Sequence, residues 1–494
     1  MSTVQKLCLD DIHRLYTKGT LYNTYYSKAK TRVEMRIIEA SALIRSAPTW
    51  TERLHSEEKR EEWAAQVKES LKLTDKEVEY VFAELEYYAK LQASRHSGEV
   101  LGGVDKVWIS DSASNCELIN EFEKSAARLA DDHDTTHLGG IANRSFVTVQ
   151  VLIDPFKYPY SSLALRPLDR PITTPEASLD HVGSAVETDT LNKVLSWLPT
   201  DFTVNNDGSV KIVSYINNLH PTRYAELYRS ISKVFANMVP LLEQVATDTL
   251  CPRDERVSFD YMDLAAHAEP EPLPFNPGNR PIIPYSLRGL NLQASIEMTS
   301  INLIPENPTL ADGRWQAMGR GKERIFAVGL YFYETENIAS AKLKLRDPIM
   351  SHIFESQEEE DKFCKAHNVT VDSYGSRKLV QEFEGIEIKA GRYICYPNLY
   401  QAKMPAFTLA DPTKPSCVKC IAFYIVDPAT KVLSTDTIPP RDPTWGKAGH
   451  PVTSSLSEEE CNRRDFLRRK HAKETECSEG RFEASLEVDI YRND

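Results

Sequence analysis

The 494-residue sequence has few cysteines, fewer basic than acidic residues and no long apolar run, and each shortage excludes a class of protein. Nine cysteines without regular spacing argue against a secreted disulfide framework, so we expect reduced thiols. Lysine and arginine total 59 against 72 aspartates and glutamates, a net charge of −13, whereas nucleic-acid binders need a basic surface. No window reaches the roughly 20 apolar residues of a membrane span, and the first residues lack the apolar stretch of a signal peptide. We therefore expect a cytoplasmic protein that binds neither nucleic acid nor membrane.

Common catalytic and metal-binding motifs are also missing. The sequence contains no GxGxxG after a predicted strand, no GxxxxGK[ST], no GxSxG and no HExxH. His133 and His137 have the spacing of metal ligands on a helix, but the run DDHDTTH lacks apolar residues and favours a solvated loop. Cys417 and Cys420 form a lone CxxC at the start of a β-rich run, where residues three apart diverge, so we expect them to share neither zinc nor a disulfide. The Gly-rich loop 319–322 suits a hairpin turn as well as an anion.

The first hundred residues are predicted to be mainly helical. Thr74 and Glu77 form a capping box, which opens a helix that extends to about Gln92. Apolar residues recur along it every three or four positions and should form one buried stripe: Val78, Val81, Phe82, Leu85 and Tyr88. Residues 94–200 contain short β-like runs among Pro-rich and acidic loops, and the sequence predicts no firm structure there.

From about residue 200 the pattern becomes β-rich. FTV and SVKIVSYI flank the turn NNDG, whose residues tolerate positive φ, so we predict a hairpin. An amphipathic helix follows over 221–248, with Pro221 as its first residue and Pro240 expected to kink or end it. Between 291 and 436, β-rich runs alternate with Gly, Pro and Asp turns, which is typical of an antiparallel barrel or a double-sheet jelly roll.

These patterns predict an α+β protein in three parts. Residues 1–195 form a mainly helical region, and residues 196–445 form a jelly-roll core that includes the long helix. Residues 446–494 form a C-terminal helix and tail, opened by a capping box of Ser457 and Glu460.

Six segments, in order along the chain, resemble a large, mostly fungal family known as a domain of unknown function. The core of that family is thought to be a double-stranded β-helix, a cupin-like jelly roll, like that of the iron(II) and 2-oxoglutarate dependent dioxygenases. The resemblance therefore implies this fold for the chain from about residue 20 to 475. The segments are SYINNLHPT (214–222), DGRWQAMG (312–319), LYFYETENI (330–338), YPNLYQ (396–401), DPTKP (411–415) and IVDPATKVLSTDTIPP (425–440).

The same resemblance implies that the metal site of the family is lost. Where this chain reads WQAMG the family typically reads Trp-His-x-Glu-Gly, and where this chain reads QA it reads Gln-His. The two histidines and the glutamate of an iron site thus fall at Gln316, Met318 and Ala402, which we call the triad positions. A family arginine suited to the 2-oxoglutarate carboxylate falls at Val418, and the adjacent Lys419 should point to the other face of its strand. We expect neither iron nor 2-oxoglutarate to bind.

Aromatic and polar residues near these positions could still line a pocket for a small molecule. One hypothesis is a metal-independent enzyme, placed by the implied fungal origin in specialised-metabolite biosynthesis. A second is a non-catalytic ligand-binding or scaffold protein, and a third is a dioxygenase with unrecognised ligands. The sequence leaves the substrate, the reaction and the oligomeric state open. The candidate pocket residues, besides the triad positions, are Trp315, Tyr331, Tyr333, Asn398, Tyr400 and Gln401.

Overall fold

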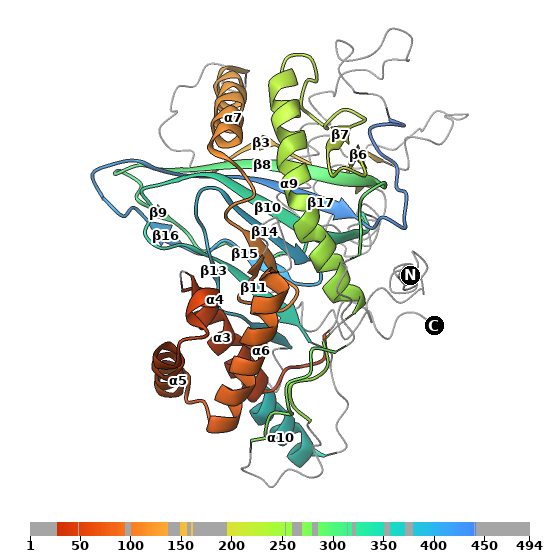
Figure 1. The fold of residues 1–494 in the computed structure, drawn as a ribbon. Helices are drawn as coiled ribbons and strands as arrows, with labels where there is room; N and C mark the ends of the chain where they lie inside the picture. Colours follow the sequence, from red (N-terminus) through yellow and green to blue (C-terminus); the bar gives the residue numbers. More distant parts are fainter. Residues whose placement is uncertain are drawn as a thin grey trace.

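The computed structural model shows a mixed protein of helices and antiparallel strands (Figure 1). The expected C-terminal helix, the loop 319–322 and His137 lie outside the residues that the structure describes. These residues are 27–47, 49–93, 100–136, 149–155, 160–161, 195–251, 253–258, 269–278, 285–313, 315–318, 323–349, 356–370, 379–438 and 440.

The N-terminal helices gather at one end of the molecule, and a long helix crosses the largest sheet (Figure 1). The N-terminal group is α3 (Arg32–Arg45), α4 (Trp50–Arg53), α5 (Glu57–Leu71) and α6 (Asp75–Ala93). The others are α7 (Cys116–Thr136), the crossing helix α9 (Ala225–Leu250) and α10 (Gln357–His367).

Helix α6 confirms the predicted capping box and buried stripe. The Thr74 backbone N–H donates to Glu77 Oε2 at 2.8 Å, and the Glu77 N–H donates to Thr74 Oγ1 at 3.3 Å. The five apolar residues of the predicted stripe are all buried. Local signals therefore determine this helix, because its cap and its periodicity agree.

Two helices differ from the sequence-based expectations. Helix α9 begins at Ala225 rather than at Pro221. Of the two outcomes expected at Pro240, a kink or an end of the helix, the end does not occur. Proline lacks the N–H that would bond the carbonyl of Ala236, but the buried apolar face on both sides of Pro240 holds the helix on the sheet. Residues 131–136 lie in α7 rather than in a loop, because the helix is already established by Asn115, whose Oδ1 accepts from the Leu118 N–H at 2.9 Å.

The largest sheet is antiparallel throughout and contains strands from both halves of the chain. Its order is β1-β2-β14-β10-β17-β8-β6-β7, and β3 also pairs with β8. The hairpin of β6 and β7 confirms the turn predicted at NNDG, and the β-rich runs after residue 291 form strands as predicted. The bounds are β1 (Val100–Leu101), β2 (Trp108–Ser110), β3 (Val149–Ile153), β6 (Thr200–Val204), β7 (Val210–Ile212), β8 (Asn291–Leu303), β10 (Ile325–Glu336), β14 (Arg392–Pro397) and β17 (Ser416–Val426).

Smaller sheets complete the β structure. Strand β11 (Lys342–Pro348) pairs with β12 (Val380–Glu382), β13 (Ile386–Glu387) and β15 (Gln401–Lys403). Strand β9 (Thr309–Leu310) pairs with β16 (Phe407–Thr408), and β4 (Tyr160–Ser161) pairs with β5 (Leu195–Ser196).

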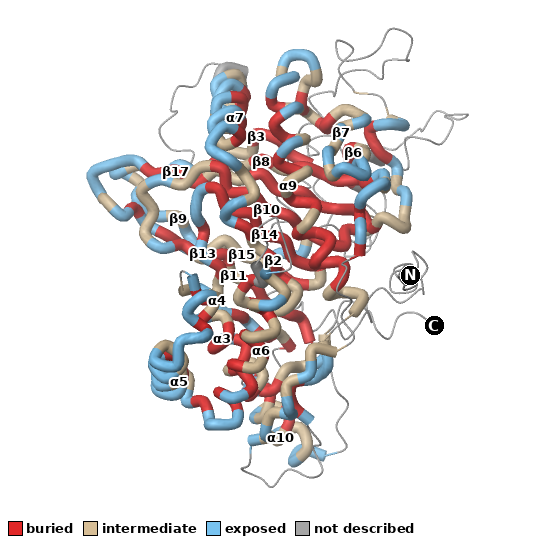
Figure 2. Tube along the Cα trace, in the orientation of Figure 1, coloured by how far each residue is buried: buried red, intermediate tan, exposed pale blue. Residues whose placement is uncertain are grey.

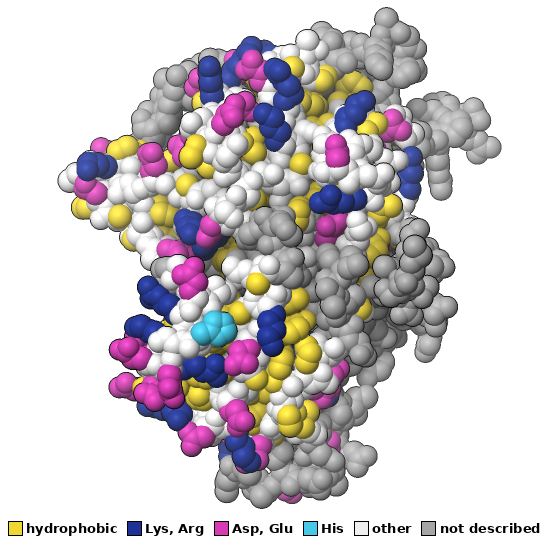
Figure 3. Space-filling model, in the orientation of Figure 1, with side chains coloured by type: hydrophobic (Ala, Val, Ile, Leu, Met, Phe, Trp, Pro, Cys, Tyr) yellow, Lys and Arg dark blue, Asp and Glu magenta, His cyan; other side chains and the backbone are white. Residues whose placement is uncertain are grey.

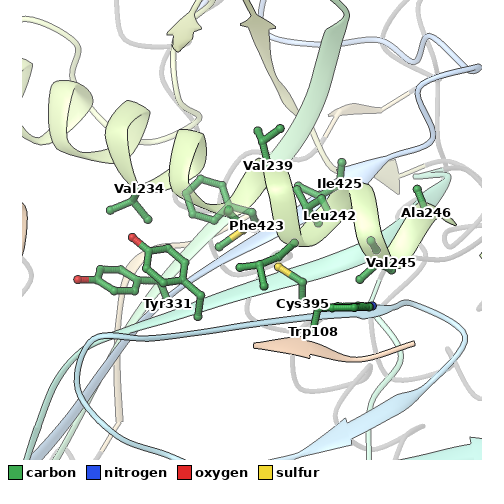
Figure 4. Close-up of a cluster of buried hydrophobic side chains, with 14 of the residues drawn as sticks. Trp108, Val234, Val239, Leu242, Val245, Ala246, Tyr331, Cys395, Phe423 and Ile425 are labelled. Atoms are coloured by element: carbon green, nitrogen blue, oxygen red, sulfur yellow. The ribbon is translucent and has the colours of Figure 1, made fainter. Parts of the chain in front are cut away.

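The large sheet has an apolar core on each face, so buried residues run along its central strands (Figure 2). The first core joins the sheet to α9, α7 and the N-terminal helices, and Figure 4 shows Val239, Leu242 and Val245 of α9 among its members. The second core joins the opposite face to β11 and β15. Side chains alternate between the two along β10, where Tyr331 belongs to the first core and Phe332 to the second.

A close contact in the first core requires a glycine. A Cβ at Gly329 of β10 would overlap the sulfur of Met238 on α9, and both residues lie in the tightly packed interface between sheet and helix. Glycine therefore lets α9 approach the sheet at this point.

The outer surface mixes charges of both signs. Figure 3 shows lysine and arginine interspersed with aspartate and glutamate over the described part of one face. Among the described residues, no helix has the combination of length and hydropathy that a membrane span requires.

Candidate functional site

Two of the triad positions face each other directly. Gln316 forms an isolated antiparallel bridge with Ala402 of β15, in which the Gln316 N–H donates at 3.0 Å and the Ala402 N–H donates back at 2.9 Å. Residues paired in this way carry their side chains on the same face, so two side chains here could share one bound ion. Gln316 is exposed, whereas Ala402 and Met318 are half-buried and pack against the second core.

Asn398 fastens the segment that carries Met318 to the sheet. Its Oδ1 accepts from the Met318 N–H at 3.1 Å, and its Nδ2 donates to the carbonyls of Met318 at 2.6 Å and Ile325 at 3.2 Å. The Asn398 side chain is buried, and backbone groups take up its amide on both sides. Its described contacts are therefore those of a residue that positions the triad segment.

Trp315 and Gln401 join the same region through Arg346 of β11. Arg346 Nε donates to Gln401 Oε1 at 2.5 Å, and its guanidinium lies 4.7 Å from the centre of the Trp315 ring. The ammonium of Lys403 lies 4.9 Å from the same ring. Cations over an indole ring are attracted by its electron-rich face, so the two cations hold Trp315 in its buried position.

Tyr331 and Tyr333 are not brought to this group. Both side chains lie on the opposite face of β10, in the first core. Tyr331 stacks on Tyr393 with ring centres 4.3 Å apart, and Tyr333 contacts Phe122 of α7 at 4.9 Å. Of the candidate pocket residues, these two therefore belong to the packing between the large sheet and α7.

Val418 and Lys419 occupy opposite faces of β17. Val418 is buried in the second core, on the side of Met318 and Ala402. The ammonium of Lys419 lies 2.8 Å from each carboxylate oxygen of Glu334 and therefore cannot take the place of an arginine at Val418.

The two cysteines of the CxxC also diverge. The Cys417 thiol donates to Glu334 at 3.0 Å, whereas Cys420 packs against the second core, and both are free thiols. Cys417 is part of the group of three ligand-type residues found within the described chain, together with Glu334 and Glu336. Burial and the Glu334 carboxylate raise the pKa of Cys417 to about 12, so the thiolate that a metal requires is disfavoured.

A cavity of about 500 Å³ lies beside this region, between the N-terminal helices and one end of the large sheet. Its wall combines the starts of α3 and β2, the C-terminal end of α9 and the turn 102–107. Tyr400 is the candidate pocket residue that reaches it, and the Tyr400 hydroxyl donates to the carbonyl of Asp105 at 3.1 Å. The size is within the range of pockets that hold small molecules.

A buried ion network forms one wall of the cavity. Arg256 donates to both carboxylate oxygens of Asp105 at 2.7 and 2.8 Å and to Glu84 at 2.9 Å, and Arg253 pairs with the same Glu84 oxygen. Burial alone would raise the pKa of Asp105 and of Glu84, but the arginines outweigh it and hold both pKa values below normal. The network is therefore charged, and both arginines donate to Glu84 Oε1, whereas Glu84 Oε2 has no hydrogen-bond partner among the described residues.

The basic residues Lys30 and Lys106 complete the polar wall. The Lys30 ammonium lies 3.1 Å from Asp347, a fully buried carboxylate of β11. Lys106 is half-buried and holds a left-handed backbone conformation, with φ of 62°. Sequence reasoning missed these residues because they come from separate segments without a shared motif; the turn sequence GGVDK was the one local signal.

Comparison with solved structures finds similarity at low scores. The chain is 8% identical to the Fe(II)/(alpha)ketoglutarate-dependent dioxygenase TqaL, covering 65% of this chain and 95% of that one, with a TM-score of 0.23. It is 10% identical to AviO1 from Streptomyces viridochromogenes Tue57, covering 67% and 93%, with a TM-score of 0.25. A bsmA homolog from Methylobium petroleophilum PM1 is 9% identical, covering 46% and 70%, with a TM-score of 0.22. No curated protein matches the chain.

The sequence match to a family is extensive. Residues 75–274 and 267–449 match the family described as Protein of unknown function (DUF4246). These ranges include the triad positions, the cavity turn and most strands of the large sheet. The chain therefore belongs to the DUF4246 family.

Proposed function

We propose that this protein binds a small molecule without iron, in a core that is a degenerate relative of the iron(II)/2-oxoglutarate dioxygenases. The observation that carries the proposal is the pairing of Gln316 with Ala402 beside Met318. These side chains supply an amide, a methyl group and a thioether, whereas iron(II) in such enzymes requires two imidazoles and a carboxylate. The residues present therefore do not fit the metal, and Val418 offers no partner to a 2-oxoglutarate carboxylate.

The proposal includes a double-stranded β-helix as the core. The large sheet and the sheet around β11 would be its two layers, and the second core would fill the space between them. The position of Ala402 on β15 and of Val418 on β17, on either side of that core, supports this assignment.

The cavity beside Tyr400 is the proposed binding site. It has the volume for a small molecule, and its wall combines aromatic rings with charged groups that the protein has already fixed by hydrogen bonds. Turnover of the bound molecule is a second candidate function, favoured by Lys106 on the cavity wall, whose ammonium could stabilise negative charge that develops on a bound substrate. Fungal specialised metabolism is the proposed setting.

Iron content and 2-oxoglutarate turnover test the proposal. Purified protein is incubated anaerobically with iron(II) and 2-oxoglutarate, desalted, and analysed for iron and, after exposure to air, for succinate. We expect neither stoichiometric iron nor succinate above a sample without protein, because one amide cannot replace two imidazoles and a carboxylate. The matched comparison is the triple variant Gln316→His, Met318→Glu and Ala402→His, which restores the family residues at the triad positions. Stoichiometric iron together with succinate formation by the unchanged protein would refute the proposal.

A further inference from the structure

The acidic groups on the cavity wall already accept hydrogen bonds, whereas two donors, the Lys106 ammonium and the Tyr88 hydroxyl, have no partner among the described residues. All five acidic residues of the wall accept hydrogen bonds from protein donors: Glu34, Asp105, Asp248, Asp254 and Glu255. Among the basic residues, Lys28 pairs with Glu255, Lys30 pairs with Asp347, and the arginines pair with Glu84. For Lys106, the described residues provide no hydrogen-bond or ion-pair partner. The cavity therefore presents an ammonium for which the described residues supply no acceptor.

A ligand anion would stabilise the Lys106 ammonium in this position. Asp347, Asp105 and Asp248 attract the Lys106 ammonium through space, and Lys30 repels it. The described hydrogen bonds of these carboxylates go to Lys30, Arg256 and Trp108, and Asp347 Oδ1 has no hydrogen-bond partner within the described chain. A charged group that leaves water without a partner is costly, and a bond between an ammonium and a carboxylate is about twice as strong as a neutral hydrogen bond. A carboxylate on the ligand would supply the missing partner.

The rest of the wall indicates the body of the ligand and the number of its charges. Apolar surface comes from Leu91, Trp108 and Leu399, so a hydrocarbon or aromatic body fits beside the ammonium. A doubly charged phosphate would need a second cation, but the guanidinium of Arg256 is occupied by Asp105 and Glu84. One negative charge therefore matches this wall better than two.

We propose that the cavity binds a monocarboxylic acid with an apolar body, whose carboxylate pairs with the Lys106 ammonium. This inference rests on the proposed function and specifies its ligand class. The turn at Lys106 fixes the backbone from which the ammonium extends, because Lys106 holds a left-handed conformation. The Gly102 N–H donates to the Val107 carbonyl at 2.6 Å across the same turn.

Calorimetric titration of the iron-free protein tests the ligand class. The probes are phenylacetate, 3-phenylpropanoate and octanoate, each compared with its primary amide and its primary amine, and inorganic phosphate. We expect one carboxylate at least to bind with a stoichiometry of one, roughly ten- to a hundredfold tighter than its amide, because the amide loses the charged hydrogen bond. This comparison needs no variant. Equal affinity of acid and amide, preference for phosphate or no binding by any acid would overturn the inference.

The variant Lys106→Asn assigns the binding to this wall. Asparagine tolerates the left-handed conformation at φ 62°, so the turn should persist while the ammonium is removed. We expect roughly a ten- to hundredfold loss of carboxylate affinity. The control Lys233→Asn removes a cation that pairs with Glu121 and does not line the cavity, and it should leave affinity unchanged. Unchanged affinity of Lys106→Asn would overturn the inference. Amide or amine binding instead of acid binding would leave the proposed function standing, whereas iron with succinate would refute the proposed function alone.

Discussion

Removal of the Arg256 side chain should destabilise the protein more than any substitution of an exposed charge. Only 5% of this side chain is exposed, and its guanidinium is the shared partner of Asp105 and Glu84. Arg256→Met keeps much of the side-chain volume but leaves Glu84, which is 1% exposed, and Asp105, which is 22% exposed, with one remaining guanidinium, that of Arg253. Breaking a buried ion pair by removing one partner typically costs about 3–5 kcal/mol, and we expect a loss in that range at pH 7.

Urea unfolding followed by circular dichroism measures the loss. The matched control is Lys28→Met, which breaks an ion pair whose side chains are 69% and 54% exposed. Exposed pairs contribute roughly 0–1 kcal/mol, so the control should change the free energy of unfolding by no more than that. A value for Arg256→Met as small as that of the control would refute the claim that the network depends on this guanidinium.

The pH dependence gives a second, independent check. In the unchanged protein the arginines hold the pKa of Asp105 below normal, so its contribution is present above about pH 4 and is lost only as pH falls through the depressed folded value. In Arg256→Met we expect the buried Glu84 carboxyl instead to favour a proton, because its burial then outweighs the remaining positive charge. Acidification from pH 7 to 5 should therefore narrow the stability gap between the two proteins. A gap that stays constant or widens would contradict this reasoning.

Three further predictions concern the core, the triad positions and the cysteines. Gly329→Ala should cost about 1–3 kcal/mol in the free energy of unfolding through overpacking against Met238, and Gly329→Ala/Met238→Ala should lose less than the sum of the single variants; additive losses would count against the contact. His, Glu and His at the triad positions should raise Tm when iron(II) is added, and a folded variant without that rise would show that the positions do not converge. Zinc analysis should find no ion shared by Cys417 and Cys420. Tetrahedral zinc that is lost when either cysteine is mutated would show that the position of this strand is wrong.

Elements whose signals are local could be predicted from the sequence. The cap and periodicity of Thr74–Leu85, the turn at NNDG and the β-rich runs after residue 291 each lie within a few neighbouring residues, and the structure confirms them. The course of α9 through Pro240 could not be predicted in this way. Its continuation depends on an apolar face held by distant strands, and tertiary packing outweighs the missing hydrogen bond.

The candidate site shows the same division. The triad positions could be identified from the sequence through the family resemblance. The structure then pairs Gln316 with Ala402, which lie in two of the segments that carry that resemblance. The cavity could not be predicted from the sequence, because Lys30, Lys106 and Arg256 come together only in the folded chain. Their separation along the sequence forms no recognisable motif. Tyr331 and Tyr333 show the converse error of sequence reasoning, since aromatic residues in a strand are compatible with either face.

The strand order also constrains how the chain reaches its native state during synthesis. Strand β17 lies between β10 and β8, so these two earlier strands have no common neighbour until residues 416–426 have left the ribosome. Strand β2 likewise cannot pair with β14 until Cys395, the register partner of Trp108, has been synthesised. Pairings between such distant segments form slowly, because closing a large loop costs conformational entropy before any stabilising contact forms. The nascent chain therefore carries unpaired, apolar strand edges until β17 has been synthesised, and we expect its yield to depend on chaperone protection during that interval.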